Sequence, residues 1–258
     1  ELPVLQITWA RYFFTVVFIF PLMLFFFKKY LVWTDKPKLQ LIRGLILLTA
    51  NISFFYSISV ISLPKALTLA FVAPLVVTAF SPFFLGESVG YRRWAAVIIG
   101  FIGSLVVIRP GFLEINLASL AALGTGIMYG FYLIITRKLS TSDNPLLTLL
   151  LTGVVGAIIA TTFMPFVWVS PTFNQWSIMA AIGLFACIGH LFIILSLRYA
   201  DASKLAPFSY FEIVTNIIIA YYFFGDFPDS WTFLGLFIIV FSGIYISRRE
   251  NIVKKIKI

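Results

Sequence analysis

The sequence predicts an all-α membrane protein, a bundle of helices that cross the bilayer many times. Hydrophobic residues make up 61% of the 258 positions and charged residues only 11%, whereas a water-soluble domain carries about 25% charged residues. Apolar runs of about 20 residues, each long enough to cross a hydrocarbon core of about 30 Å, recur along the chain. These runs do not alternate between polar and apolar residues, as the strands of a membrane barrel would. Because lipid offers no hydrogen-bond partners to the backbone, we expect the runs to be helices.

Nine spans are expected in this chain, separated by short polar loops. In order, the spans cover residues 4–27, 39–61, 65–85, 93–109, 117–136, 145–168, 176–197, 203–224 and 231–247. Each is bounded by a loop that holds basic, turn-forming or capping residues; these loops lie at 28–38, 86–93, 109–116, 137–145, 198–203 and 225–230. Pro74 lies in the middle of the third span and Pro207 near the start of the eighth, so we expect both helices to bend.

The distribution of basic residues predicts the orientation of the chain. With the C-terminal tail in the cytoplasm, sixteen lysines and arginines fall on the cytoplasmic side, and Arg11, Lys65 and Arg109 fall on the other. Short cytoplasmic loops are rich in Lys and Arg, so we expect a cytoplasmic C-terminus and, after nine crossings, an external residue 1. This placement also accounts for the formal charge of +9, so we expect the lipid bilayer, and not a nucleic acid, as the partner of the basic residues.

The two halves of the sequence form an internal repeat. A shift of 139 positions aligns Gly44-Leu45 with Gly183-Leu184, Ser57 with Ser196, Lys65 with Lys204, and Gly86 with Gly225. Paired segments run in opposite directions under the predicted orientation, which is the arrangement of an inverted-topology repeat. The alternative is a chance likeness between two segments rich in Leu and Phe. The counterpart of the span at 117–136 would precede residue 1, so we expect a natural protein of ten helices whose first helix this chain lacks.

Ionisable residues inside the spans are candidates for a solute pathway, because a charge at membrane depth is costly and is usually functional. Glu212 is the one carboxylate near the middle of a span, and His190, the only histidine, lies inside the preceding span. At 1.5 Å per residue, His190 lies about 10 Å and Glu212 about 13 Å from the cytoplasmic ends of their helices. Adjacent antiparallel helices would bring the two together. The alternatives are a protonated structural acid and a structural hydrogen bond.

Other polar residues share helical faces or repeat positions with these two. Ser209, Glu212 and Asn216 are spaced i, i+3 and i+7 on one stripe of a helix. Asn51 is the counterpart of His190 at the shift of 139. Aromatic rings with hydroxyl groups suit a pocket for an amphipathic or aromatic metabolite, although packing and interface roles are the alternative. Four tyrosines are candidates on this ground: Tyr56, Tyr129, Tyr132 and Tyr210.

No catalytic group, metal site or cofactor is expected. An intramembrane enzyme acting on lipids would need clustered acids, a Ser/His pair or a set of metal ligands at membrane depth. One histidine and one central glutamate do not make a zinc site, and the single cysteine, Cys187, excludes an intrachain disulfide. A lipid-processing enzyme and a non-transporting assembly subunit nevertheless remain the alternatives to a transporter.

Several short motifs lie in the two halves of the chain, and the first and third of them occupy matching places at the shift of 139. They are Leu85-Gly86-Glu87, Gly100-x-x-Gly103 before Ile108-Arg109-Pro110-Gly111, Phe224-Gly225-Asp226-x-Pro228-Asp229, and Ser242-Gly243-x-Tyr245. With the repeat, these motifs resemble the EamA-type branch of the drug/metabolite transporter superfamily over nearly the whole chain. The resemblance implies a first EamA-like repeat at 1–111 that lacks its first helix, a second at 115–248, and a basic cytoplasmic tail at 249–258.

The resemblance also implies a function. Members of this family are similar in having two inverted sets of five helices around a central cavity that opens to one side at a time. We therefore expect a secondary transporter or facilitator that moves a small organic metabolite across a bacterial inner membrane by alternating access. The sequence leaves open the identity of the solute, the direction of transport, proton coupling and the oligomeric state.

Overall fold

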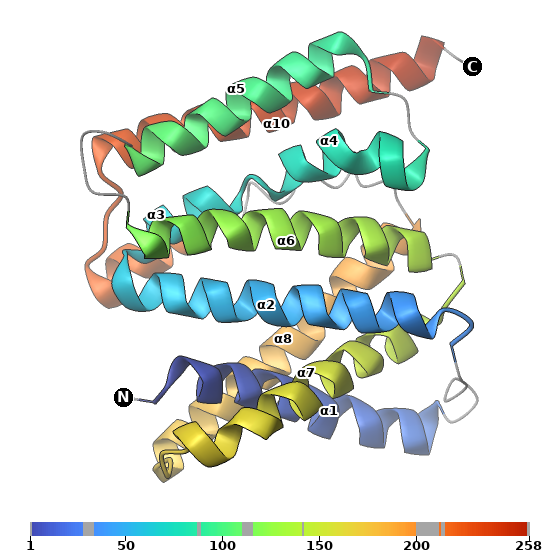
Figure 1. Cartoon of the computed structure of the whole chain (residues 1–258), viewed down its shortest axis with the longest axis vertical. Helices are drawn as coiled ribbons and strands as arrows, with labels where there is room; N and C mark the ends of the chain where they lie inside the picture. Colours follow the sequence, from blue (N-terminus) through green and yellow to red (C-terminus); the bar gives the residue numbers. More distant parts are fainter. Residues whose placement is uncertain are drawn as a thin grey trace. The chain divides into compact units, whose positions relative to one another are not determined.

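The computed structural model of the chain is built from helices. It describes residues 2–27, 34–86, 89–109, 116–140, 142–199, 212 and 215–256, with the backbone alone at 247 and 249–256. Within these residues the regular elements are all helices and none is a strand (Figure 1). Seven helical segments of the described part are long and apolar enough to cross a membrane, and two further apolar helices are shorter. The prediction of a polytopic all-α membrane protein is confirmed.

The helices follow the predicted spans with ends that differ by a few residues, except that α10 continues to Ile256, nine residues past the predicted end of the ninth span. In chain order they are α1 (Val4–Phe26), α2 (Pro37–Val60), α3 (Leu63–Ala70), α4 (Ala73–Leu85), α5 (Tyr91–Ile108), α6 (Leu117–Leu139), α7 (Pro145–Val167), α8 (Phe173–Tyr199), the short helix Thr215–Phe224, and α10 (Ser230–Ile256). The third predicted span therefore contains two helices, α3 and α4, and the described part of the eighth is short.

The break in the third span has two causes. Pro74 lies in the first turn of α4, where its missing N–H leaves no hydrogen bond unmade. The broken backbone also lies against α6 at two glycines. A Cβ atom added to Gly126 would lie 2.6 Å from the carbonyl oxygen of Ala70, and one added to Gly130 would lie 3.0 Å from that of Ala73. Glycines four residues apart let two membrane helices approach closely. The bend at Pro74 is confirmed, whereas Pro207 lies outside the described residues.

The chain divides into two compact units, and each unit takes segments from both halves of the sequence. Unit 1 comprises Glu1–Ile52 and Ile135–Tyr199, and unit 2 comprises Ser53–Ile134 and Ala200–Ile258. The boundary runs through α2 and α6, so the N-terminal part of α2 and the C-terminal end of α6 belong to unit 1. Neither unit therefore corresponds to one half of the sequence.

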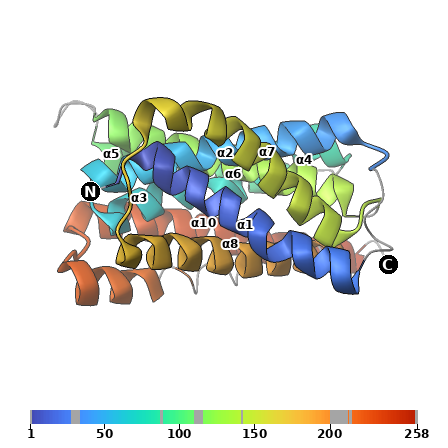
Figure 2. The ribbon, with the colours of Figure 1, turned by 90° about the horizontal axis from the view of Figure 1, so that it is seen from below.

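In unit 1, α1 contacts both α7 and α8 (Figure 2). The indole N–H of Trp9 donates a 2.9 Å hydrogen bond to the hydroxyl of Thr161, and Val16 lies against Gly153. Residue numbers thus rise along α1 as they fall along α7, so the two helices are antiparallel. The shift of 139 makes α7 the counterpart of α1, and the pair therefore consists of two matched helices that run in opposite directions.

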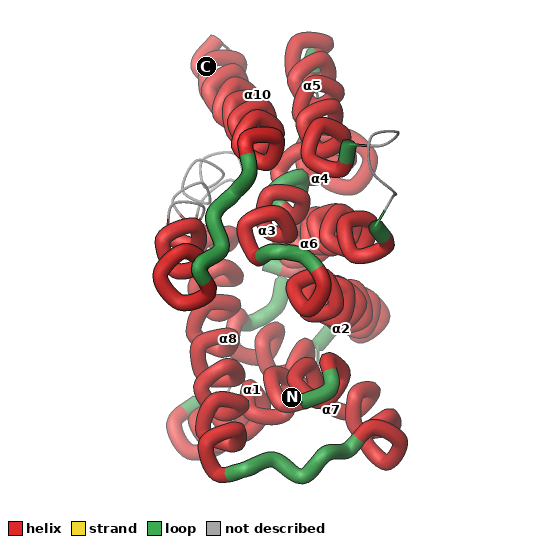
Figure 3. The backbone as a smooth tube through the Cα atoms, turned by 90° about the vertical axis from the view of Figure 1, so that its left-hand side faces the viewer, coloured by secondary structure: helices red, strands yellow, loops and turns green. Residues whose placement is uncertain are grey.

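In unit 2, α5 and α10 lie side by side (Figures 1 and 3). Arg109 meets Asp229 near one end of the pair, and a Cβ atom added to Gly235 would lie 2.7 Å from the carbonyl oxygen of Gly103. This pair is antiparallel as well, and α10 is the counterpart of α5 at the shift of 139. A helix that packs against its inverted copy must run antiparallel to it, so both matched pairs have the geometry that an inverted repeat requires.

The two matched glycines end their helices in the same way. Gly86 and Gly225 both have a φ of 69°, a left-handed conformation that favours glycine. At the second of these ends, the backbone N–H of Gly225 donates to Tyr221 and that of Asp226 donates to Ala220, each over 3.1 Å. These bonds satisfy carbonyl groups that the end of a helix leaves without partners. Both helices thus end where the predicted spans at 65–85 and 203–224 end, while Glu87 lies outside the described residues.

Candidate functional site

A polar cluster lies among the apolar helices of unit 1. A guanidinium nitrogen of Arg11 on α1 lies 2.5 Å from Nε2 of His190 on α8. The next residue of α1, Tyr12, accepts a 2.7 Å hydrogen bond at its hydroxyl from the side-chain amide of Asn51 on α2. Asn51 and His190 were matched by the repeat, and they contact neighbouring residues of α1. We call these four residues the unit 1 polar cluster.

The contact between Arg11 and His190 defines the proton on the imidazole. A guanidinium group carries only donors, so Arg11 donates and Nε2 of His190 accepts. The ring is therefore neutral, with its proton on Nδ1. Arg11 itself is 8% exposed and is the eighth residue of α1, about 10 Å from the start of that helix. The cluster thus holds a full positive charge at membrane depth, where charges are rare and usually functional.

A second buried arginine lies in the same unit. Arg43 on α2 is fully buried. Its Nε donates to the hydroxyl of Thr136 over 2.7 Å, and its NH1 group donates to the carbonyl oxygen of Thr148 over 3.2 Å and to the hydroxyl of Thr152. The charge count placed Arg43 with the cytoplasmic basic residues, but the structure shows that it belongs to the interior of the unit. The excess of basic residues on that side remains large without it.

An acidic residue next to this arginine network joins α2 to α7. Asp143 is buried, and its Oδ2 accepts hydrogen bonds from the hydroxyl of Thr34 and the amide of Gln40, both over 2.6 Å. Gln40 also donates to the hydroxyl of Thr148 over 3.1 Å, and Thr148 in turn accepts from Arg43 through its carbonyl oxygen. These bonds fix the start of α2 against the start of α7, which is a structural task.

The predicted acidic stripe belongs to unit 2 and is described in part. Glu212 has helical backbone and an exposed side chain. Asn216, one turn further along, is half-buried and hydrogen-bonds the carboxyl group of Glu212. Ser209 and Tyr210 lie outside the described residues. His190 belongs to unit 1, so the predicted encounter of His190 with Glu212 stays a prediction.

The other candidate tyrosines also lie in unit 2. Tyr129 and Tyr132 on α6 stack on each other, with ring centroids 5.5 Å apart and ring planes inclined by 16°. Tyr132 is fully buried and Tyr129 is half-buried, whereas Tyr56 on α2 is exposed. Stacking and burial suit Tyr132 for packing inside the unit, and the partly exposed Tyr129 is the better placed of the two to meet a solute.

Reasoning from the sequence missed Arg11 and Arg43. The rule that charges inside a span are functional was applied to carboxylates, although it holds equally for cations. Arg11 lies within an unbroken apolar run and Arg43 lies inside the second predicted span, so the signal was present for both. Tyr12 carried no such signal, because a tyrosine in a span is most often a packing residue.

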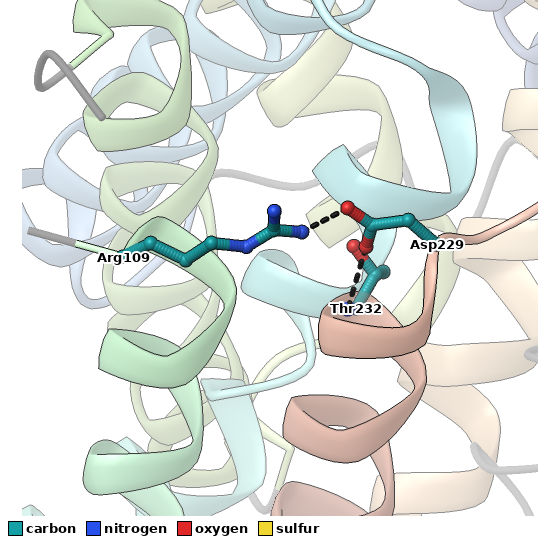
Figure 4. Close-up of polar contacts among 3 residues, drawn as sticks. All are labelled: Arg109, Asp229 and Thr232. Atoms are coloured by element: carbon teal, nitrogen blue, oxygen red, sulfur yellow. Dashed lines mark hydrogen bonds and ion pairs between the residues drawn. The ribbon is translucent and has the colours of Figure 1, made fainter. Parts of the chain in front are cut away.

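One ion pair closes the end of the α5–α10 pair (Figure 4). Arg109 follows the last residue of α5 and donates to Asp229, which also accepts a 2.7 Å hydrogen bond from the backbone N–H of Thr232 in the first turn of α10. Partial burial would raise the pKa of Asp229, but the hydrogen bonds from Thr232 and Arg109 outweigh it and lower the pKa from 3.8 to about 2. Since Asp229 caps a helix and pairs with a partner, we assign it a structural task.

The helical membrane fold defines the class of polytopic α-helical membrane proteins, in which a charged group buried among the helices marks a candidate functional site. The family model described as the EamA-like transporter family matches residues 1–109 and 116–248. The chain therefore belongs to the EamA-like transporter family, a family of multi-pass membrane transporters.

Curated relatives of the chain are transporters as well. The chain is 26% identical to the S-adenosylmethionine uptake transporter of Rickettsia bellii, over 97% of this chain and 87% of that protein. It is 28% identical to the riboflavin transporter of Vibrio cholerae, over 72% of this chain and 63% of that protein. The pseudopaline exporter CntI of Pseudomonas aeruginosa is 25% identical over 82% of this chain and 75% of its own length.

One solved crystal structure has a similar fold. It superposes with a TM-score of 0.70 over 96% of this chain and 89% of the other, at 18% sequence identity. At this identity the likeness extends to the fold alone, and it agrees with the helical architecture of this chain.

Proposed function

We propose that this protein is a secondary transporter that moves a small organic metabolite across a bacterial inner membrane. Its family and its relatives support this proposal, because the relatives are named for the transport of S-adenosylmethionine, riboflavin and pseudopaline. The single observation that carries it is the unit 1 polar cluster, in which Arg11 and His190 meet inside a set of apolar helices. Such a cluster gives a polar solute partners that lipid does not offer.

Transport would proceed by alternating access. The repeats at 1–111 and 115–248 would form two halves of opposite orientation, and tilting of one half against the other would open a central site to each side of the membrane in turn. The antiparallel pairs α1–α7 and α5–α10 support this proposal, since each pairs a helix with its inverted counterpart. The basic tail at 249–258 would lie in the cytoplasm beside anionic lipid.

The proposed pathway follows the residues that the sequence singled out. Glu212 would take up and release a proton or bind a cationic part of the solute, and His190 and Asn51 would contribute hydrogen bonds. The complete set is Asn51, Tyr56, Tyr129, Tyr132, His190, Ser209, Tyr210, Glu212 and Asn216.

The test is transport by the purified protein in lipid vesicles. The test panel consists of S-adenosylmethionine, L-methionine and riboflavin, each supplied in labelled form. A carrier takes up its solute in a saturable way, and the same solute placed unlabelled inside the vesicles accelerates entry of the label. We expect this behaviour for at least one compound of the test panel. Absence of saturable uptake for all three would contradict the proposal.

Variants test the pathway residues in the same vesicles. Replacement of Glu212 by Gln is expected to remove the pH dependence of uptake if Glu212 carries the coupled proton, and to slow uptake at every pH if Glu212 binds the solute. Arg92→Gln is the control, because Arg92 is exposed and its guanidinium group bonds only the neighbouring Tyr91 in the described part of the chain. Unchanged transport by Glu212→Gln at every pH would exclude a direct role for this carboxylate.

A further inference from the structure

We infer that Arg11 is the docking point for a carboxylate group of the transported solute and that His190 holds its guanidinium group in position. This inference rests on the proposed transport function and names a chemical class for the solute. It concerns contacts within unit 1 alone.

Arg11 carries an uncompensated charge. It is 8% exposed, and within the described residues its side chain has two contacts, the neutral imidazole of His190 and the ring of Tyr12, whose centroid lies 5.1 Å away. Neither contact supplies a negative charge. A buried cation that lacks an anion is strongly unfavourable in an apolar environment, so the site is poised to accept an anionic group.

The geometry leaves donors for such a group. A guanidinium group has five N–H donors in a planar fork, and the contact with His190 uses one nitrogen, NH2. The others suit the two oxygens of a carboxylate, which an arginine binds through paired, charge-assisted hydrogen bonds.

The position of Arg11 distinguishes a solute from a lipid headgroup. Its backbone oxygen lies beside Gly183 of α8, but its side chain reaches His190, which is seven residues or about 10 Å further along that helix. The helices α1 and α8 run in the same direction, because Trp9 shares an apolar cluster with Met179, and Ile19 shares one with Cys187. The guanidinium group is thus directed from the nearer end of α1 toward the bilayer centre, away from the headgroups.

The repeat makes this site unique to one half of the chain. At the shift of 139, the counterpart of Arg11 is Leu150. The charge of Arg11 in the first half of the chain therefore has no counterpart in the second half. We accordingly infer one carboxylate site per chain.

Competition for uptake tests the inference. The unlabelled competitors are two matched pairs. S-adenosylmethionine is compared with decarboxylated S-adenosylmethionine, and L-methionine is compared with L-methionine amide, so that each pair differs in the carboxylate group. In the wild-type protein we expect the carboxylate to compete at a concentration about tenfold or more below that of its matched form, as charge-assisted hydrogen bonds imply. In Arg11→Gln the ratio of the two competing concentrations, that of the matched form over that of the carboxylate, should fall to about one, whereas in the control Arg92→Gln this ratio should not change.

A second variant covers the case in which Arg11→Gln does not fold, as judged by gel filtration and thermal unfolding. Arg11→Lys keeps the charge but loses the planar fork, so its ratio should lie between that of the wild type and one. Three outcomes would overturn the inference and leave the transport function in place. They are equal competition by both forms in the wild type, a ratio of competing concentrations that does not change in Arg11→Gln or in Arg11→Lys, and transport of riboflavin alone. Failure to transport any compound of the test panel would contradict both.

Discussion

Two arginines of unit 1 hold their charges in different ways. Arg43 is surrounded by threonine hydroxyl and carbonyl oxygens from α6 and α7, which spread its charge over several fixed dipoles. Arg11 has one neutral imidazole and one aromatic ring. We therefore interpret Arg43 as a structural cation that joins helices and Arg11 as a cation that is available to a ligand.

The structural task of Arg43 leads to a prediction at the scale of one hydroxyl group. Thr152→Val keeps the shape of the side chain but removes an acceptor from the buried NH1 group of Arg43. We expect the free energy of unfolding to fall by about 1–3 kcal/mol, the cost of a buried donor that loses a partner. Thr162→Val is the matched control, because Thr162 lies exposed on the same helix and its hydroxyl bonds the carbonyl oxygen of Ile159.

Unfolding of the three proteins in one detergent, followed by circular dichroism, measures this difference. The control is expected to change stability by less than about 0.5 kcal/mol, as exposed substitutions usually do. Equal stability of Thr152→Val and Thr162→Val would show that the hydrogen bond to Arg43 contributes nothing.

The ion pair at Asp229 leads to a prediction about pH. The pKa of Asp229 in the folded protein is about 2, below its ordinary value of 3.8. Its charge therefore stabilises the fold above pH 3.8, and this contribution is lost as the pH falls toward about 2. Because the carboxylate is 52% exposed, solvent screening keeps the effect small.

Asp229→Asn isolates the charge, since asparagine caps a helix as well as aspartate does. We expect the variant to unfold at a lower temperature than the wild type at pH 6, and the two unfolding temperatures to converge as the pH approaches 2. A constant difference across this range would mean that the charge of Asp229 does not stabilise the fold.

At the scale of the element, the broken span and α6 form one packing unit. The carbonyl group of Ala70, at the end of α3, lies where a side chain at position 126 would otherwise be. Pro74 produces the break, and the absence of a side chain at Gly126 of α6 makes room for it. For this reason we expect substitutions at Gly124 and Gly126, two glycines of α6, to have opposite effects on stability.

Gly126→Ala is expected to destabilise the protein and Gly124→Ala is expected to stabilise it. A Cβ atom at Gly126 would lie 2.7 Å from Val72 and closer still to Ala70, while one at Gly124 would meet nothing within 4 Å. Overpacking costs about 1–3 kcal/mol, whereas alanine favours a helix over glycine by up to about 1 kcal/mol. Thermal unfolding of both variants checks the prediction, and a shift in the same direction for both would show that the contact with the broken span is not tight.

At the scale of the whole molecule, the charge distribution predicts one orientation. The structure places Arg43 and Arg93 among buried residues and Arg11 inside a helix, so these three are not loop charges. Without them the count is still fourteen against two. The rule concerns basic residues in short loops, so the corrected count supports the same orientation.

Reporter fusions test this orientation in a bacterial host. Alkaline phosphatase, which is active outside the cytoplasm, should be active when fused in the 109–116 loop and inactive in the 137–145 loop or after residue 258. Green fluorescent protein should give the reverse pattern. Phosphatase activity at residue 258 would overturn the predicted orientation and the inside location of the basic tail.

The sequence by itself determined the properties that depend on neighbouring residues. The lengths of apolar runs predicted the helices, because crossing the bilayer needs a fixed number of residues. Two predicted spans end just before Gly86 and Gly225, and both glycines have the same left-handed conformation at the end of a helix. The bend near Pro74 followed from the chemistry of proline. The charge count and the shift of 139 together predicted inverted halves, in agreement with the antiparallel pairs α1–α7 and α5–α10.

Only the tertiary structure decided which distant residues meet. Arg11 and His190 are 179 positions apart, and Asn51 reaches Tyr12 across 39. Every span is apolar on nearly all sides, so hydrophobic periodicity does not identify the face that turns inward. The partners of Arg11 and Arg43 are set by the packing of whole helices, where the close approach at glycines such as Gly156 and Gly183 fixes the rotation of α1 against its neighbours. For this reason the sequence predicted His190 and Asn51 as pathway residues, whereas the role of Arg11 was recognised only from the tertiary structure.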